Sequence, residues 1–426
     1  MTIEGLYQLY LQHPNVQTDT RSLQPDCFFF ALKGDKFNGN RFAQQAVDQG
    51  AAYVIIDESE FAIEGKTILV SDVLTTLQQL AAHHRNQLQI PVMGITGSNG
   101  KTTSKELVHA VLATTYRTST TVGNLNNHIG IPLTLLRIPL DAEMAVVEMG
   151  ANHQREIAGY CTYAQPSHGI ITNCGKAHLE GFGGVEGVRK GKGELYDHLR
   201  GVNGTAFVMW DYDYLRNMSA GIAHCLKYGT AEADVEGRIV QAQPFIEVEM
   251  TQGALIGSIR TQLVGDYNLP NVLLAVAVGQ YFNVAPEMIR QAIESYAPSN
   301  SRSQLIEQGT NHIILDAYNA NPSSMRGAIE NLTRLQAENK VLLLGAMAEL
   351  GDESLEEHQQ IVKLIGQHEW KAVVLVGGDF DKIGHPYISF SDSLAAREWF
   401  QAQAFEDCHI LIKGSRSQQM EKIIQS

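Results

Sequence analysis

The sequence predicts an α/β protein with three domains: a central domain built on a mostly parallel sheet of the P-loop type, and a doubly wound α/β domain at the C-terminal end. A chain of 426 residues is too long for one core of ordinary size. Short apolar strand candidates alternate with helical patterns, which favours parallel sheets. One strand candidate also leads directly into a glycine-rich loop followed by a helix.

The first predicted domain covers residues 1–86 and is a small α/β unit. Its strand candidates, residues 28–32 and 52–56, are short apolar runs. Between them lies a helical pattern that ends at Gly50, because glycine is a common helix terminator.

The second predicted domain covers residues 87–298 and the third covers residues 299–426. In the second, the predicted elements are strands at 90–96, 144–148 and 169–172 and a closing helix at 270–281. In the third, the predicted strands are 313–315, 341–344, 373–376 and 410–412, separated by helical stretches. This alternation is typical of a doubly wound sheet.

Composition excludes several classes of protein. A formal net charge of -14 gives no general footprint for nucleic acid or an anionic membrane. The five cysteines form no C-x-x-C pair, which favours reduced thiols in the cytoplasm. The first residues lack a signal peptide pattern, and no apolar run approaches the ~20 residues needed to cross a bilayer. We expect a cytoplasmic monomer that inserts into no membrane.

The glycine-rich loop predicts a binding site for the phosphates of ATP. Glycines allow the backbone N–H groups to approach a phosphate, and the helix that follows adds its N-terminal amides and dipole. Lysine would reach the outer phosphates, and the first threonine hydroxyl would hold Mg²⁺. The predicted ATP-binding residues here are Gly97, Ser98, Asn99, Gly100, Lys101, Thr102 and Thr103. Ile95 replaces the first glycine of the strict motif, and the alternative is a turn with no ligand.

Three further side chains are candidates for metal binding and catalysis with Lys101. Glu148 ends an apolar strand, where a doubly wound sheet binds ligands, although a capping glutamate is the alternative. On chemistry alone His178 is more typical of a loop histidine, since Mg²⁺ prefers oxygen ligands. Spacing alone favours a solvated basic face for Lys192 and its neighbours Arg189 and Lys190.

Long motifs spread over the chain resemble those of the Mur ligases. The motifs are the glycine loop, DTR at 19–21, FFALKG at 29–34, GNLNNHIGIP at 123–132, EMGANH at 148–153, AHLEGFG at 177–183, DAYNANP at 316–322 and KGSR at 413–416. This family activates a carboxylate with ATP and joins it to an amine. The match is most similar to the members that add D-alanyl-D-alanine to UDP-N-acetylmuramoyl-tripeptide, and it implies these two substrates.

The resemblance implies roles that composition and spacing do not supply. It implies Thr102, Glu148 and His178 as ligands of Mg²⁺, with Mn²⁺ as a substitute, and Lys192 as a lysine that CO₂ carbamylates into a further metal ligand. It also implies an adenine site at Asn268 and Asn271, whose amides offer both a donor and an acceptor. Polar caps of a helix N-terminus are the alternative there.

The other implied contacts lie in all three domains. Arg302 and Asp316 would reach ATP, with an ordinary ion pair as the alternative. The implied substrate-binding residues are Thr20, Arg21, Lys33 and Gly34 for the UDP end, and Asn126, Asn127, Tyr318, Asn319, Lys413 and Arg416 for the rest.

Three positions depart from the family pattern: Tyr267 where histidine is usual, Ala346 where aspartate is usual, and His128 where an acidic residue or its amide is usual. Two alternative functions remain open. One is a sibling ligase that adds a single amino acid. The other is a nucleotide-binding homologue that has lost catalysis.

Overall fold

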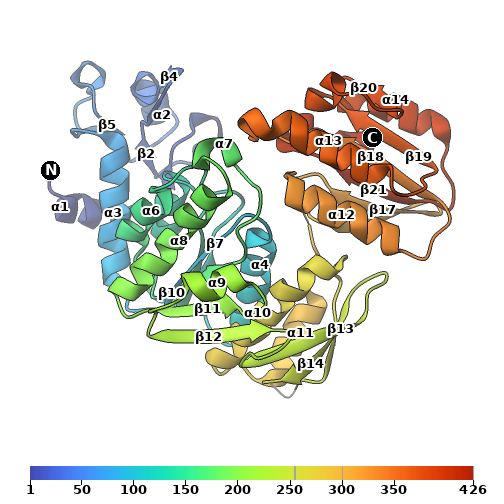
Figure 1. The fold of residues 1–426 in the computed structure, drawn as a ribbon. Helices are drawn as coiled ribbons and strands as arrows, with labels where there is room; N and C mark the ends of the chain where they lie inside the picture. Colours follow the sequence, from blue (N-terminus) through green and yellow to red (C-terminus); the bar gives the residue numbers. More distant parts are fainter. Residues whose placement is uncertain (254–255, 300, 426) are drawn as a thin grey trace.

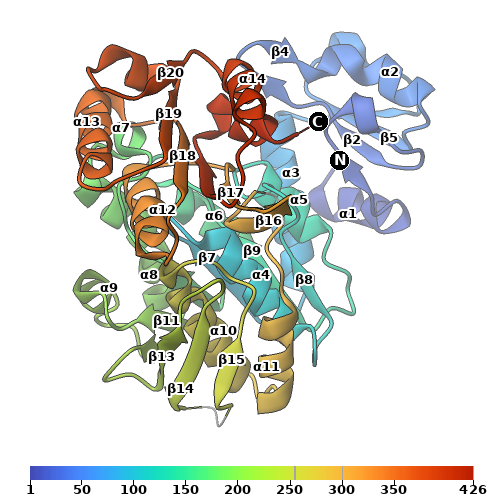
Figure 2. The same cartoon turned by 90° about the vertical axis from the view of Figure 1, so that its right-hand side faces the viewer.

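The structure, a computed structural model, describes residues 1–253, 256–299 and 301–425 and confirms the predicted fold class (Figure 1). Three large sheets, flanked by helices, succeed one another along the described chain, and a two-stranded hairpin adds a fourth, small sheet. Turned by 90°, the N-terminal and C-terminal parts lie side by side above the central part (Figure 2). In the part of the chain that the structure describes, every helix is too short or too polar to cross a bilayer.

The N-terminal sheet is parallel, with the strand order β1–β2–β5–β6. Its elements are β1 (Val16–Gln17), β2 (Phe28–Phe30), β5 (Tyr53–Ile56), β6 (Thr67–Leu69), the small hairpin β3 (Lys33–Gly34) and β4 (Phe37–Asn38), and helices α1 (Ile3–Gln12), α2 (Ala43–Asp48) and α3 (Val73–Gln87). Successive side chains of a strand face opposite sides. Accordingly Phe28 and Phe30 join the large core, whereas Phe29 packs with Ala43 and Ala46 beneath α2.

The central sheet has nine strands in the order β15–β14–β13–β12–β11–β10–β7–β9–β8. The strands are β7 (Val92–Thr96), β8 (Thr118–Thr120), β9 (Met144–Glu148), β10 (His168–Ile171), β11 (Thr205–Met209), β12 (His224–Gly229), β13 (Val235–Gln241), β14 (Glu247–Gln252) and β15 (Ser258–Arg260). The helices are α4 (Lys101–Leu112), α5 (Gly130–Leu136), α6 (Glu156–Ala164), α7 (Leu179–Phe182), α8 (Val185–Gly201), α9 (Asp213–Met218), α10 (Leu269–Tyr281) and α11 (Pro286–Ser295). Pairing is parallel from β8 to β13 and antiparallel from β13 to β15.

The C-terminal sheet has the order β16–β17–β21–β18–β19–β20 and is parallel except for β16. Its elements are β16 (Gln304–Gln308), β17 (Asn311–Asp316), β18 (Lys340–Gly345), β19 (Ala372–Val376), β20 (Ile388–Phe390), β21 (His409–Lys413) and helices α12 (Pro322–Arg334), α13 (Ser354–Ile365) and α14 (Ser393–Gln403). The four strands predicted from apolar runs coincide with β17, β18, β19 and β21. The domain limits at residues 86 and 298 stay predictions.

A buried arginine connects the N-terminal helix α3 to the central domain. The Arg85 guanidinium donates to the carbonyl oxygens of Leu88 at 2.8 Å, Ala164 at 3.1 Å and Gln165 at 3.1 Å, and so caps the C-terminal end of α6. Because the residue is only 9 % exposed, removing these donors leaves buried carbonyls without partners. We expect Arg85→Met to lower the free energy of unfolding by about 3 kcal/mol in urea titrations. The exposed Arg41→Met is the control, and equal unfolding midpoints would contradict the capping role.

Candidate active site

A cavity of about 720 Å³ lies between the central and C-terminal domains. Its floor is the edge where β7, β9 and β10 end, because the register pairs Ile95 with Glu148 and Thr96 with Ile171. The strand order changes direction at β7, because β9 and β8 lie on one side of it and β10 to β15 lie on the other. Open α/β sheets bind their ligands at such a point. The volume is within the range of small-molecule sites. The C-terminal domain contributes residues Arg302, Asp316, Tyr318, Asn319, Glu349 and Lys413 to the wall.

The glycine loop connects β7 to α4 in a conformation that needs its glycines. Gly97 has φ +145°, and a Cβ there would lie 1.9 Å from Oγ1 of Thr172. Gly100 has φ +79° at the N-cap of α4. The Thr172 hydroxyl donates to the carbonyl of Asn99 at 2.6 Å, and the Asn173 side chain accepts from the Asn99 N–H at 3.0 Å. The end of β10 therefore clamps the loop at the N-terminus of α4, where an anion is favoured.

Lys101 is folded over this loop. Its Nζ donates to the carbonyls of Gly97 at 2.7 Å and Ser98 at 3.3 Å. Burial lowers the pKa of Lys101, an effect that the carboxylate of Glu148 opposes. The other predicted phosphate-loop residues that line the cavity are Ser98, Asn99, Gly100, Thr102 and Thr103.

Glu148 is a buried carboxylate, 2 % exposed, at the end of β9. Oε2 accepts from the Thr102 hydroxyl and Oε1 from the Asn126 side chain, each at 2.8 Å. Within the described residues there is no cluster of three or more His, Cys, Asp or Glu side chains placed to hold a metal ion. Carboxylate and hydroxyl oxygens nevertheless fit Mg²⁺, which typically takes one or two protein ligands and completes its shell with phosphate oxygens and water.

His178 lines the same cavity but faces the C-terminal domain. Its Nδ1 lies 2.6 Å from Oε2 of Glu349, although the ring N–H is not aligned for a hydrogen bond. The contact with His178 holds the pKa of the Glu349 carboxyl below its usual value. The structure therefore places Thr102 with Glu148, and His178 with Glu349.

Lys192 is buried, with Nζ 2.9 Å from the carbonyl oxygen of Ala151 and over the ring of Phe182. Ala151 lines the cavity, whereas Lys192 lies outside its lining. Burial lowers the pKa of Lys192 to about 7, and the charge of Lys101 adds to this effect. The solvated-face alternative is wrong for Lys192, although Lys190 two residues earlier is exposed.

The predicted adenine-binding amides support one another. Asn271 donates to Oδ1 of Asn268 at 2.8 Å and accepts from the Ser104 hydroxyl at 2.9 Å, while Asn268 donates to the carbonyl of Val264 at 2.9 Å. Both amides are buried and line the cavity. Tyr267 lies beside them, and its hydroxyl is 3.0 Å from that of Ser303 across the domain interface.

The C-terminal domain presents a cation and an ion pair to the cavity. The Arg302 guanidinium lies 3.6 Å from the centre of the Tyr318 ring. Lys413, 1 % exposed, has Nζ 2.5 Å from Oδ2 of Asp316 and 3.2 Å from the carbonyl of Asn319. These contacts hold Asp316 at the end of β17, beside Lys413 at the end of β21.

Arg416 and Asn127 each interact with neighbouring groups of the protein. Arg416 is paired with Glu421 at 2.8 Å and lies outside the cavity lining. Asn127 lines the cavity, and its Oδ1 accepts from the N–H groups of Ile129 at 3.1 Å and Gly130 at 2.9 Å at the start of α5.

The predicted UDP-binding residues lie in the N-terminal domain, outside the cavity lining. Thr20 and Arg21 belong to one 3-10 turn, where Arg21 pairs with Asp19 and lowers the pKa of that carboxyl to about 2. Gly34 adjoins Lys33 in the β3–β4 hairpin.

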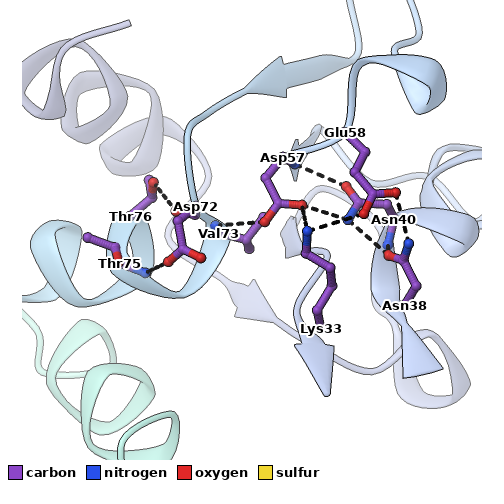
Figure 3. A network of polar contacts seen from close by, with 9 residues as sticks. All are labelled: Lys33, Asn38, Asn40, Asp57, Glu58, Asp72, Val73, Thr75 and Thr76. Atoms are coloured by element: carbon purple, nitrogen blue, oxygen red, sulfur yellow. Dashed lines mark hydrogen bonds and ion pairs between the residues drawn. The ribbon is translucent and has the colours of Figure 1, made fainter. Parts of the chain in front are cut away.

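Lys33 enters a network of polar contacts that Figure 3 shows from close by. Its Nζ lies 2.9 Å from the buried carboxylate of Asp57 and 3.2 Å from that of Glu58. Asn38 and Asn40 donate to the same two carboxylates, each at 2.8 Å. The ammonium is thus held in one place while its side chain stays 44 % exposed.

The departures from the family pattern have different surroundings. Ala346 is 1 % exposed and its methyl group is closely packed, since a Cβ at Gly378 would lie 2.5 Å from it. Ala346 lies outside the cavity lining, and an aspartate there would place a carboxylate in the core of the C-terminal domain. His128, in contrast, lines the cavity.

Several cavity residues were not singled out from the sequence. Thr172 ends a predicted strand and Asn173 follows it directly, so the position of that strand beside the glycine loop could have indicated both residues. Asn321 of the C-terminal domain donates from its side chain to Oδ1 of Asn99 in the glycine loop at 2.7 Å. Such a contact between residues far apart in the chain has no local sequence signal.

The chain is similar to Mur ligases along nearly its whole length. Residues 14–90 match the catalytic domain of the Mur ligase family, residues 95–279 the Mur ligase middle domain, and residues 301–416 the glutamate ligase domain of Mur ligases. Curated relatives named UDP-N-acetylmuramoyl-tripeptide--D-alanyl-D-alanine ligase are 35% identical in Bacillus subtilis (96% of this chain, 92% of the relative) and 33% in Escherichia coli (96% and 93%).

Solved structures show the same likeness. MurF from Acinetobacter baumannii superposes with a TM-score of 0.87 at 29% identity, covering 99% of this chain and 97% of that one. MurF ligase from Thermotoga maritima in complex with ADP also has a TM-score of 0.87, at 25% identity and with 97% of each chain covered. The chain therefore belongs to the Mur ligase family.

Proposed function

We propose that the protein is an ATP-dependent ligase that joins D-alanyl-D-alanine to UDP-N-acetylmuramoyl-tripeptide in the cytoplasmic synthesis of peptidoglycan precursors. The observation that carries this proposal is the pairing of Thr102 with Glu148 beside the glycine loop, in a cavity that the C-terminal domain closes. The relatives named for this activity match the chain from the N-terminal to the C-terminal domain. We further propose a monomer.

The first step transfers the γ-phosphoryl group of ATP to the tripeptide carboxylate. A carboxylate oxygen forms a bond to the γ-phosphorus, and the bond from that phosphorus to the β-phosphate oxygen breaks. ADP is released, and the tripeptide now carries an acyl phosphate. Lys101, the amides of the glycine loop and the N-terminus of α4 stabilise the charge on the transferring group, which is how enzymes catalyse phosphoryl transfer. Thr102 and Glu148 would hold Mg²⁺, or Mn²⁺ in its place, and the ion would supply positive charge to the phosphates.

The second step joins the amine. The amino group of D-alanyl-D-alanine attacks the acyl carbon, phosphate leaves, and an amide forms with the loss of a proton. The acyl phosphate must be protected from water, which closure of the C-terminal domain would achieve. Contacts across the interface support this role: Asn321 with Asn99 at 2.7 Å, and an ion pair between Lys176 and Glu357.

We assign the remaining predicted residues by location. Asn268, Asn271 and Asp316 bind the nucleoside end of ATP and Arg302 binds its phosphates, with Lys413 holding Asp316 in place. Thr20, Arg21, Lys33 and Gly34 bind the UDP end of the other substrate. Asn126, Asn127, Tyr318 and Asn319 bind its peptide or the dipeptide. Arg416, paired with Glu421, is the weakest of these candidates.

The activity is tested by mixing the protein with ATP, Mg²⁺, UDP-N-acetylmuramoyl-tripeptide and D-alanyl-D-alanine and measuring ADP. We expect ADP release only when both co-substrates are present. Replacing the dipeptide by free amino acids tests the sibling ligase, which would release ADP with one of them instead. ADP release that does not depend on the dipeptide would overturn the assignment, and no release under any condition would favour an inactive homologue.

A further inference from the structure

The loop at residues 345–351 brings an acidic side chain from the C-terminal domain to the central domain. It leaves β18, and its Glu349 lines the cavity beside Ala348. Oε2 of Glu349 lies 2.6 Å from Nδ1 of His178, whose side chain is 19 % exposed. Lys101, Thr102 and Glu148 line the same cavity as Glu349. Glu349 therefore lies next to the predicted phosphate and metal site.

The loop that carries Glu349 is fixed from its own domain. The N–H of Met347 donates to Nε2 of the fully buried His358 at 3.0 Å, and the carbonyl of Ala346 accepts from the Ser415 hydroxyl at 2.6 Å. Glu349 itself has φ +62°. This left-handed conformation strains a non-glycine residue, and it persists where the surroundings determine it.

The loop also fits closely against the segment that carries His178. Gly351 has φ +55°, and a Cβ there would lie 3.1 Å from Cβ of Glu180. The turn η5 (Gly351–Glu353) thereby approaches α7, which begins directly after His178. The Glu349 contact is thus part of a packed interface between the two domains.

The contact between Glu349 and His178 is of the kind that orients histidine ligands of metal ions. A histidine that binds a metal through one ring nitrogen commonly directs the other N–H at a carboxylate, which fixes the ring and raises the basicity of the ligand. With Glu349 on the Nδ1 side of His178, a metal ion has access only to Nε2.

We propose that Glu349 is a positioning residue that orients His178 for a second metal ion. The inference rests on the proposed role of His178 as a metal ligand. Its consequence is that the metal site at Glu148 and Thr102 uses residues of the central domain alone, whereas the site at His178 also needs Glu349 of the C-terminal domain.

The test is a titration of the full-length protein with Mn²⁺ in the presence of a non-hydrolysable ATP analogue, with free Mn²⁺ measured by electron paramagnetic resonance. We expect Glu349→Gln to weaken one of two Mn²⁺ sites by about 10- to 100-fold and to leave the other unchanged. The Mg²⁺ concentration for half-maximal activity should rise, while KM for the dipeptide stays near the wild-type value. Glu349→Gly should behave alike, because glycine adopts the left-handed backbone without strain.

Two controls separate orientation of His178 from loosening of the interface. Glu356→Gln removes an exposed charge from α13, and Glu357→Gln removes the ion pair with Lys176 without touching His178. Both should keep two Mn²⁺ sites. If Glu357→Gln weakened Mn²⁺ binding as much as Glu349→Gln does, orientation by Glu349 would be refuted.

His178→Ala distinguishes failure of this inference from failure of the metal role. If His178→Ala weakens one Mn²⁺ site and Glu349→Gln does not, Glu349 does not position the ligand and the metal role of His178 stands. If His178→Ala leaves both Mn²⁺ sites unchanged, His178 is not a metal ligand. The metal role of His178 and the positioning role of Glu349 are then both refuted.

Discussion

Replacing Lys101 by alanine is expected to lower kcat by about 10³-fold while the protein remains folded. Lys101 is the lysine of the glycine loop, and its Nζ already lies at the loop carbonyls around which the phosphates would bind. Since the transferring phosphoryl group carries dense negative charge, losing this ammonium removes an interaction that strengthens in the transition state. Burial lowers the pKa of Lys101, so its charged form is costly in the folded protein and its removal should not destabilise the fold.

The measurement is steady-state ADP release with all substrates saturating, together with the urea midpoint of each variant. Lys363→Ala, on the exposed face of α13, is the matched control and should have the wild-type rate. A wild-type kcat for Lys101→Ala would refute the role of the loop in phosphoryl transfer. A loss of activity that accompanies a lowered unfolding midpoint would show a structural role instead.

The strands that could be predicted are buried on both faces, although β11, which is also buried throughout, was missed. Strands such as β9 and β18 are continuous apolar runs because helices cover both sides of a parallel sheet. Strands β13 to β15 were missed, since they pair antiparallel at an edge of the central sheet and alternate buried with exposed residues. Their polar positions resemble loops when only apolar runs are counted.

Some residues of the site could be predicted from the sequence and others could not. The glycine loop and Glu148 could be located because the loop directly follows one apolar strand and Glu148 ends another, and parallel register then brings the strand ends together. Glu349 could not, because its position depends on how two domains meet. The surroundings of Lys192 were equally hidden: exposed Lys190 and buried Lys192 read alike in sequence, and only the packing of α8 separates them.

Lys192→Ala is expected to lower kcat by about 100-fold or more, because we propose that Lys192 acts as a carbamate. CO₂ reacts with a neutral amine, and an ordinary lysine is almost entirely charged at neutral pH. Burial, with the charge of Lys101, lowers the pKa of Lys192 to about 7. Roughly half of the Lys192 amine is therefore neutral at neutral pH. The neutral fraction rises with pH, so carbamate loading should be greater at pH 8 than at pH 6.

Incubation with ¹³C-bicarbonate followed by ¹³C NMR should show one carbamate signal in the wild type and none in Lys192→Ala. Lys190→Ala, two residues away and exposed, should keep both the signal and the activity. Removing CO₂ from the buffer should lower wild-type activity, and bicarbonate should restore it. A fully active wild type without a carbamate signal would leave Lys192 as a buried amine bound to the carbonyl of Ala151. Carbamylation would change the charge of the Lys192 side chain from positive to negative. A positive Lys192 disfavours the charged form of Lys101, whereas a negative carbamate would favour it.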